Sequence, residues 1–321
     1  MALARPFRVR LQMSFLFPVG LILILASWLV AWSDIPIATE YSFVPLWLGY
    51  ISLINGISEL MTRTSLIRKM GTSFLILFAI SIPFWWFFEF LNSIVQNWRY
   101  ILPYPMSSFE LNVRASISFS TVIPAVLSTI FLFYRVAAAH QFVIQTQSFR
   151  VRRRRLFISM LVGAISLYLL ARIPHIAFPL VWIAPILLLE PVLYSFNYPS
   201  LLREAEGGEW SSIVAVMTGT LFTGFWWEVW NLQSSPKWIY TIPYLGFWKI
   251  FEMPILGYLG YPLFGLIVYS YTMFVLSGVL GKQTAQNLIF FNQQANSLVS
   301  QDESVMVVPE RSERRQSWAD Q

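Results

Sequence analysis

The stretch "FWWEVWNLQSSPKWIYTIP", residues 225–243, decides the fold because its pattern occurs a second time in the chain. The other copy reads "FWWFFEFLNSIVQNWRYILP" and covers residues 84–103. Each copy has the order ExxN, then WxYxxP, and each is followed by a Phe-Glu pair. The aligned pairs are Glu89 with Glu228, Asn92 with Asn231, Trp98 with Trp238, Tyr100 with Tyr240, Pro103 with Pro243, and Glu110 with Glu252. This pattern predicts an internal duplication.

The match continues upstream of the two copies. "SLIR" at 65–68 corresponds to "SLLR" at 200–203, and Asn55 corresponds to Glu190. If each copy holds four membrane spans, the chain returns to the same side of the membrane after each copy. The duplication therefore predicts two parallel four-helix repeats, related by an axis along the membrane normal.

The composition places these repeats in a membrane. The chain of 321 residues is 56% hydrophobic and only 12% charged, against about 25% charged residues in soluble domains. Apolar runs long enough to cross a bilayer recur along most of the chain. We predict an all-α integral membrane protein with about eight spans, at 14–32, 41–58, 72–92, 114–134, 156–173, 176–196, 211–230 and 254–280.

The basic residues predict the orientation. With the N-terminus in the cytoplasm, 17 of the 22 Lys and Arg residues fall on the cytoplasmic side of these spans. This asymmetry is typical of a protein of the cell or inner membrane with both termini cytoplasmic. It also explains the net charge of +6 without a nucleic-acid partner. The run "RVRRRR", 150–155, is interpreted as a cytoplasmic anchor that is compatible with attraction to anionic lipid.

The spans and charges together predict the domain organisation. We expect a cytoplasmic N-terminus at 1–13, a first repeat at 14–134, a basic cytoplasmic linker at 135–155, a second repeat at 156–281, and a polar, largely disordered cytoplasmic tail at 282–321. The chain has no cysteine, and its two histidines lie far apart in the sequence. A metal site is therefore not expected, and no cofactor is predicted.

The carboxylates within or at the edges of spans are the candidates for chemistry. Glu228 and Asn231 lie three residues apart and so share a helix face. A carboxyl group in hydrocarbon is costly and should face the interior of the helix bundle. We expect the WxYxxP segments to fold back as interfacial loops that bring each ExxN towards its Phe-Glu pair, which gives two similar pockets covered by Trp and Tyr. A structural alternative, in which the polar groups only hold helices and loops together, is preferred for Asn92 and Asn231.

The order of acid, asparagine, WxYxxP loop and an acidic, proline-containing helix start resembles the small membrane lycopene cyclases, the heterodimeric or fused bacterial and fungal type. A similar FWWE and FEMPxLGYLG pattern is typical of a wider set of uncharacterised bacterial multi-pass membrane proteins. The cyclase resemblance implies acid-initiated cyclisation of an isoprenoid in carotenoid biosynthesis, which is an isomerisation. It implies Glu228 and Glu252 as the acid and base pair, oriented by Asn231, in a site lined by Trp227, Trp238, Tyr240 and Tyr258. Glu89, Asn92, Trp98, Tyr100 and Glu110 are then a second site or a structural copy.

Two other function classes stay open. Repeat symmetry is also typical of carriers, and Glu190 within "LLLEPVL" is then a possible proton site. A non-catalytic scaffold or lipid-binding subunit, alone, as a homo-oligomer or in a membrane complex, would use the Trp-rich loops for docking. In each case the expected partner is a membrane lipid or an apolar isoprenoid.

Overall fold

The computed structural model describes residues 15–33 and 35–289. The predicted N-terminal segment 1–13 and the last part of the predicted tail, 290–321, lie outside these ranges. The first residues of that tail form a helix. The helices are α1 (Leu16–Ala31), α2 (Pro36–Tyr41), α3 (Phe43–Thr62), α4 (Leu66–Met70), η1 (Gly71–Phe74), α5 (Leu75–Val95), α6 (Ser108–Phe119), α7 (Val122–Ala139), α8 (Arg153–Arg172), α9 (Pro174–Ala177), η2 (Phe178–Trp182), α10 (Ala184–Ser195), α11 (Leu201–Glu206), α12 (Ser211–Asn231), η3 (Ile255–Leu259), α13 (Gly260–Leu280) and α14 (Lys282–Ile289).

The protein is a multi-pass membrane protein, mostly helical, as the sequence predicts. Six helical stretches of the described part of the chain are long and apolar enough to cross a membrane. They are Phe43–Thr62, Leu66–Val95, Ser108–Ala139, Arg153–Arg172, Pro174–Ser195 and Ile255–Leu280. Two further predicted spans coincide with α1, which has 16 residues, and α12, which carries several Ser, Thr and Gly residues. The count of eight spans therefore stays a prediction.

Helix α1 packs closely against α3. Gly20 on α1 makes this possible, because a Cβ atom at this position would lie only 2.3 Å from the backbone nitrogen of Leu53. Small residues allow helix backbones to approach in this way in membranes, where no hydrophobic force drives the helices together. Helices α8 and α10 also pack against each other and occupy the corresponding place in the second half of the chain.

The predicted span at 114–134 is longer than expected and is broken in two. It begins with α6 at Ser108, where the Ser107 side chain accepts a hydrogen bond from the backbone N–H of Glu110 (3.2 Å). Ser81 of α5 binds backbone groups on both sides of the break before α7. The Ser81 hydroxyl donates to the carbonyl of Phe119 (2.5 Å) and accepts from the N–H of Ile123 (3.1 Å). A buried side chain thus replaces the helical hydrogen bonds that the break removes.

The WxYxxP segments fold back but are not loops, which corrects the sequence prediction. Strand β1 (Trp98–Ile101) pairs with β2 (Lys237–Tyr240) in an antiparallel ladder. A second short pair joins β3 (Lys249–Ile250) to β4 (Met253–Pro254). The all-α description therefore needs these four short strands added. Alternating aromatic residues have high β propensity, but the partner strand lies about 140 residues away in the chain and is not visible in a local pattern.

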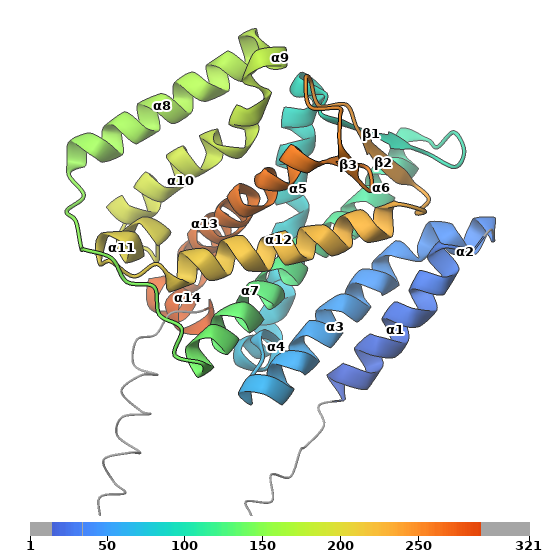
Figure 1. Ribbon diagram of the computed structural model, residues 1–321, viewed down its shortest axis with the longest axis horizontal. Coiled ribbons are helices and arrows are strands. Elements are labelled where there is room, and N and C mark those ends of the chain that lie inside the picture. Colours follow the sequence, from blue (N-terminus) through green and yellow to red (C-terminus); the bar gives the residue numbers. More distant parts are fainter. Residues whose placement is uncertain (1–14, 34, 290–321) are drawn as a thin grey trace, which may run out of the picture.

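Figure 1 shows that the strands lie at one end of the long helices and that α4, α11 and α14 lie at the opposite end. Arg63, Arg68 and Lys282 belong to the end with α4 and α14. The predicted linker 135–155 is shorter than expected, since α7 continues to Ala139 and α8 begins at Arg153.

Candidate functional site

A cavity of about 470 Å³ lies where the two copies of the repeated segment meet. Both copies supply its walls. Trp85, Trp98 and Tyr100 come from the first copy, and Trp227, Trp238 and Tyr240 come from the second. The β1–β2 ladder holds the two sets of side chains together. The two separate pockets that the sequence predicts are therefore parts of one aromatic cavity.

Glu89 lies at the wall of this cavity and is partly buried. Its Oε1 atom accepts three hydrogen bonds, from Trp85 Nε1 (3.0 Å), Trp98 Nε1 (3.1 Å) and the Tyr100 hydroxyl (2.6 Å). The two tryptophans and the tyrosine thus fix the position of this carboxyl group.

Glu228 occupies the matching position in the second copy and is fully buried. Its Oε1 atom accepts hydrogen bonds from the hydroxyls of Tyr240 (2.6 Å) and Tyr261 (2.5 Å). Trp238 Nε1 donates to the Tyr240 hydroxyl (3.0 Å) instead of to the carboxylate. The second oxygen, Oε2, is buried and has no hydrogen-bond partner among the described residues. Tyr240 and Tyr261 line the cavity, so phenol groups separate Glu228 from the cavity space.

The two carboxyl groups have different hydrogen-bond donors because two residues near them differ between the copies. Trp85 lies four residues before Glu89, and Gly224 lies four residues before Glu228, so the two residues correspond. A Cβ atom at Gly224 would lie 2.4 Å from the ring of Tyr261. In the alignment of the two Phe-Glu pairs, Tyr261 of the second copy corresponds to Phe119 of the first copy. The missing side chain at Gly224 therefore makes room for the phenol that binds Glu228.

The phenols keep their protons at neutral pH. Burial raises the pKa of Tyr240 well above its ordinary value of 10.0. Burial, reinforced by Glu89, does the same to the pKa of Tyr100. Both phenols are therefore protonated across the physiological range.

Asn92 and Asn231 hold the strands to the helix ends. The Asn231 side chain donates to the carbonyl of Trp238 (2.7 Å) and accepts from the N–H of the same residue (2.9 Å). Asn92 makes the same two contacts with Trp98, at 2.9 and 3.2 Å. The expected role of Asn231 in orienting the acids is thus not what its hydrogen bonds do. Both asparagines have the structural role that the sequence favoured.

Glu190 and Asn55 also make matching contacts. Glu190 accepts from the Ser270 hydroxyl (2.5 Å) and from the N–H of Leu202 (2.8 Å). Asn55 donates to the Ser128 hydroxyl (2.9 Å) and accepts from the N–H of Ile67 (3.0 Å). Ser128 and Ser270 correspond to each other in the repeat, because their separation in the chain equals that of the two Phe-Glu pairs. A neutral amide in the first half thus binds the serine and the backbone N–H that correspond to the partners of Glu190, although Asn55 donates to its serine and Glu190 accepts from its serine.

Glu252 and Tyr258 lie beside the cavity and not in its wall. The Glu252 carboxylate pairs with Lys237 Nζ (2.6 Å), and the Tyr258 hydroxyl donates to the carbonyl of Ile250 (3.1 Å). Within the described ranges, no hydrogen bond joins Glu252 to Glu228. The partner of Glu252 is therefore Lys237 of β2 and not Glu228, which the sequence predicted.

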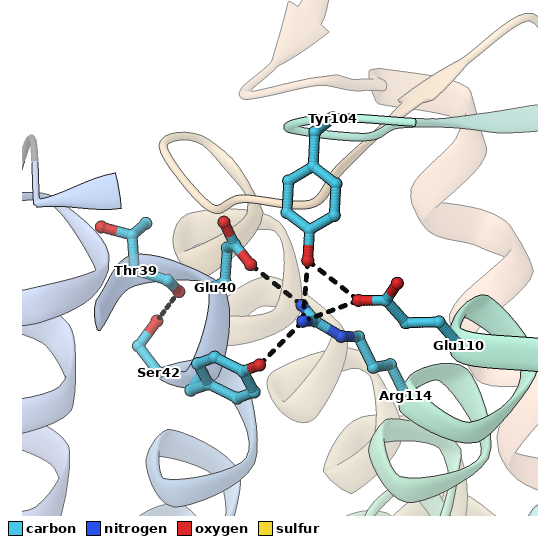
Figure 2. A network of polar contacts seen from close by, with 7 residues as sticks. Thr39, Glu40, Ser42, Tyr104, Glu110 and Arg114 are labelled. Carbon is cyan, nitrogen blue, oxygen red and sulfur yellow. Dashed lines mark hydrogen bonds and ion pairs between the residues drawn. The ribbon is translucent and has the colours of Figure 1, made fainter. Parts of the chain in front are cut away.

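Glu110 belongs to an ionic network that the sequence did not predict (Figure 2). Arg114 of α6 pairs with Glu110 (2.9 Å) and with Glu40 (3.0 Å), and its guanidinium also donates to the hydroxyls of Tyr41 (2.7 Å) and Tyr104 (2.8 Å). These contacts tie α2 and the 102–107 segment to α6, and Arg114 and Glu40 line the cavity. The available signal was an arginine at the start of a predicted span, where a cation needs partners.

Tyr261, Trp85 and Gly224 are the site residues that sequence reasoning missed. The sequence signal for them was that these positions differ between the two copies. This difference is seen only when the alignment of the copies is continued beyond the shared motif. Within the described residues there is no cluster of three or more His, Cys, Asp or Glu side chains that could hold a metal ion. Comparison of the chain with protein-family models, with curated proteins and with solved structures gave no match.

Proposed function

We propose that this protein is a cofactor-independent membrane isomerase that binds the end of an apolar isoprenoid and cyclises it by proton transfer, as lycopene-type cyclases do. The observation that carries the proposal is the shared aromatic cavity. One carboxyl group, Glu89, lies in its wall, and a second, Glu228, lies directly behind two phenols that line it. Apolar pockets with a few convergent polar groups are typical of ligand sites.

The proposed reaction needs no oxidant. A proton adds to a terminal carbon–carbon double bond and leaves a carbocation, and the π electrons of a second double bond attack this cation and close the ring. The new cation then loses a proton from a neighbouring carbon, so that the product is an isomer of the substrate. Aromatic faces stabilise cations through their quadrupoles. Trp85, Trp98, Trp227 and Trp238 supply such faces around the cavity.

Glu228 is the proposed acid and Glu89 the proposed base. An unpartnered, buried Oε2 is less costly on a neutral carboxylic acid than on a carboxylate. Glu228 acts through Tyr240 or Tyr261: with its proton on Oε1, the carboxyl group gives this proton to the phenol oxygen while the phenol gives its own proton to the substrate. The three donors to Glu89 all bind Oε1, so Oε2 is the atom proposed to receive the final proton. In this scheme Glu252 holds β2 through Lys237.

The proposal includes eight spans, arranged as two parallel repeats with the basic end in the cytoplasm of the cell or inner membrane. The matched contacts of Asn92 and Asn231 support the repeat. The matched contacts of Asn55 and Glu190 support it independently at the other end of the helices. An even number of spans in each repeat agrees with a parallel arrangement.

The test is pigment analysis in a lycopene-accumulating bacterium that expresses the chain. We expect a ring-containing pigment from the intact protein and its loss with Glu228→Gln and with Glu89→Gln. Glu59→Gln is the matched control, because Glu59 accepts a hydrogen bond from Ser65 at the end of α3 that is far from the cavity. No new pigment from well-inserted intact protein would contradict the cyclase proposal.

A lipid-binding subunit is the second candidate, favoured by the fact that Glu89 is already occupied by three donors of the protein itself. The purified chain would then retain an apolar lipid without changing it. Chromatography of the extracted lipid before and after incubation distinguishes the two proposals. The carrier hypothesis, which rests on Glu190 as a proton site, stays a prediction, and proton-coupled uptake that Glu190→Gln abolishes would support it.

A further inference from the structure

The segment between α7 and α8 is held firmly against the rest of the protein. It runs along α11 in an extended form, as Figure 1 shows. Backbone hydrogen bonds join the N–H of Thr146 to the carbonyl of Gly208 (2.9 Å) and the N–H of Phe149 to the carbonyl of Glu206 (3.0 Å). The arginine run that follows, 150–155, is therefore attached to a fixed support and is not part of a free linker.

Glu206 fixes the start of this run. Its Oε1 accepts from the N–H of Val151 (2.7 Å), and its Oε2 accepts from the Tyr194 hydroxyl (2.7 Å). The Arg203 guanidinium donates to the carbonyl of Tyr194 (2.9 Å) and lies over its ring, 4.5 Å from the centroid. Three elements, α10, α11 and the extended segment, are joined at this point.

A basic cavity of about 720 Å³ opens beside Glu206, with walls formed by Arg150, Arg152, Arg153, Arg155, Tyr194 and Phe149 among others. Within the described residues, the guanidinium groups of Arg150, Arg152 and Arg153 have no hydrogen-bonded or ion-paired acceptor. Both oxygens of Glu206 are already bound to other groups. Among the described residues the cavity thus presents three guanidinium groups without a bound acceptor, and the carboxylate in its wall, Glu206, is already bound to Val151 and Tyr194.

The position of the cavity relative to α8 indicates the kind of anion. α8 begins at Arg153 and is one of the helices long and apolar enough to cross a membrane. Its next turns expose Phe157 (67%) and Leu161 (49%). A ligand at the cavity would therefore have its polar group beside the arginines and an apolar part along α8.

We propose that this arginine cavity binds the phosphate group of an anionic phospholipid, whose acyl chains lie along α8. Guanidinium groups bind phosphate oxygens through paired, charge-assisted hydrogen bonds. Basic residues that only set the orientation of the protein in the membrane need to lie near the membrane surface. They need neither a cavity of defined shape nor a carboxylate that fixes their position. The tie made by Glu206 is what distinguishes a built site from general attraction. This inference does not depend on the proposed cyclase activity.

The first experiment measures binding of spin-labelled phosphatidylglycerol to the purified protein in phosphatidylcholine nanodiscs. The variant Arg150→Gln/Arg152→Gln/Arg153→Gln should weaken binding roughly tenfold or more, because it removes the guanidinium groups that bind the phosphate. The control Arg63→Gln/Arg68→Gln/Lys282→Gln removes the same charge at the same end of the helices and should change binding less than about twofold. Equal losses in both variants would show general attraction and overturn the proposal.

The variant Glu206→Ala separates the two explanations without removing an arginine. It makes the region more positive, so general attraction predicts tighter lipid binding. A built site predicts weaker binding, because the segment that carries the arginines loses its tie. Tighter binding, in protein whose circular dichroism is unchanged, would contradict the proposal.

Competition with inorganic phosphate identifies the source of the anion. Phosphate at concentrations comparable to the lipid should leave the spin-labelled lipid bound, because it lacks the acyl chains that contact α8. Displacement at such concentrations would assign the cavity to a soluble phosphate compound and overturn the lipid proposal.

Discussion

Arg99 lies directly opposite Ile239 in the antiparallel ladder of β1 and β2. The internal alignment gives these two residues the same position in the repeated segment. On either side of them Trp98 faces Tyr240 and Tyr100 faces Trp238. A two-fold axis through the Arg99–Ile239 pair produces this register, in which each repeat donates the same strand to the other. The register supports the proposed duplication, and it brings both aromatic segments to one cavity.

The asparagines that end the two copies should contribute similarly to stability. Asn92→Ala and Asn231→Ala each leave a buried N–H and a carbonyl of a tryptophan without a partner. We expect each substitution to lower the free energy of unfolding by roughly 1–3 kcal/mol. Thermal unfolding in detergent measures this, with the exposed Asn112→Ala as control. Unchanged midpoints in both variants would contradict the structural role.

Glu190→Gln should be tolerated, whereas Glu190→Leu should not. A glutamine can donate to Ser270 and accept from Leu202, which are the contacts that Asn55 makes with Ser128 and Ile67. A leucine leaves both partners unsatisfied, which costs roughly 1–3 kcal/mol. Denaturation of both variants in the same detergent checks this. If glutamine were as destabilising as leucine, the charge of Glu190 would have a role that its contacts do not explain.

Gly224→Ala should displace Tyr261 from Glu228. The new Cβ would overlap the phenol ring, and overpacking of this kind costs about 1–3 kcal/mol. Gly278→Ala is the control, since no atom lies within 4 Å of the added group. In a background that carries Tyr261→Ala, the cost of Gly224→Ala should fall, because the overlapping ring is absent. Equal costs in both backgrounds would show that the two positions do not interact.

The pH dependence of the segment before α8 should follow Glu206. The Tyr194 hydroxyl and then the Val151 N–H hold the pKa of Glu206 below its ordinary value of 4.5. Because the folded pKa is the lower one, this stabilisation is present above pH 4.5 and is lost as the pH falls through the folded value. Hydrogen exchange at the Val151 amide, corrected for intrinsic rates, should show lower protection below that pH. In Glu206→Ala this dependence should disappear, and its persistence would assign it to another group.

Arg114→Lys should loosen α2 and the 102–107 segment. A single ammonium group cannot make the contacts that the planar guanidinium makes with Glu40, Glu110 and two tyrosines. We expect about fivefold faster hydrogen exchange in residues 36–41 and 102–107, which corresponds to about 1 kcal/mol. Arg99→Lys, at an exposed position of β1, should leave these rates unchanged. Equal rates in both variants would show that the network does not hold these segments.

The sequence predicted the elements whose cause is local. Apolar runs of membrane-spanning length identified the helices, because the bilayer requires both the length and the apolar character. The duplication identified Glu89, Glu228, Asn92 and Asn231 as equivalent, and their contacts are similar in the structure. The break between α6 and α7 was not predicted, because it depends on Ser81 of another helix.

By itself, then, the sequence determined that this is a mainly helical multi-pass membrane protein with a repeated acid, asparagine and aromatic segment. These features follow from composition and from the comparison of the chain with itself. Only the tertiary structure decided that the two segments share one cavity, that Tyr261 and not Glu252 binds Glu228, and that Lys237 binds Glu252. The physical reason is that the strand pairing and the close approach of Gly224 to Tyr261 join residues far apart in the chain, whose partners no local pattern specifies.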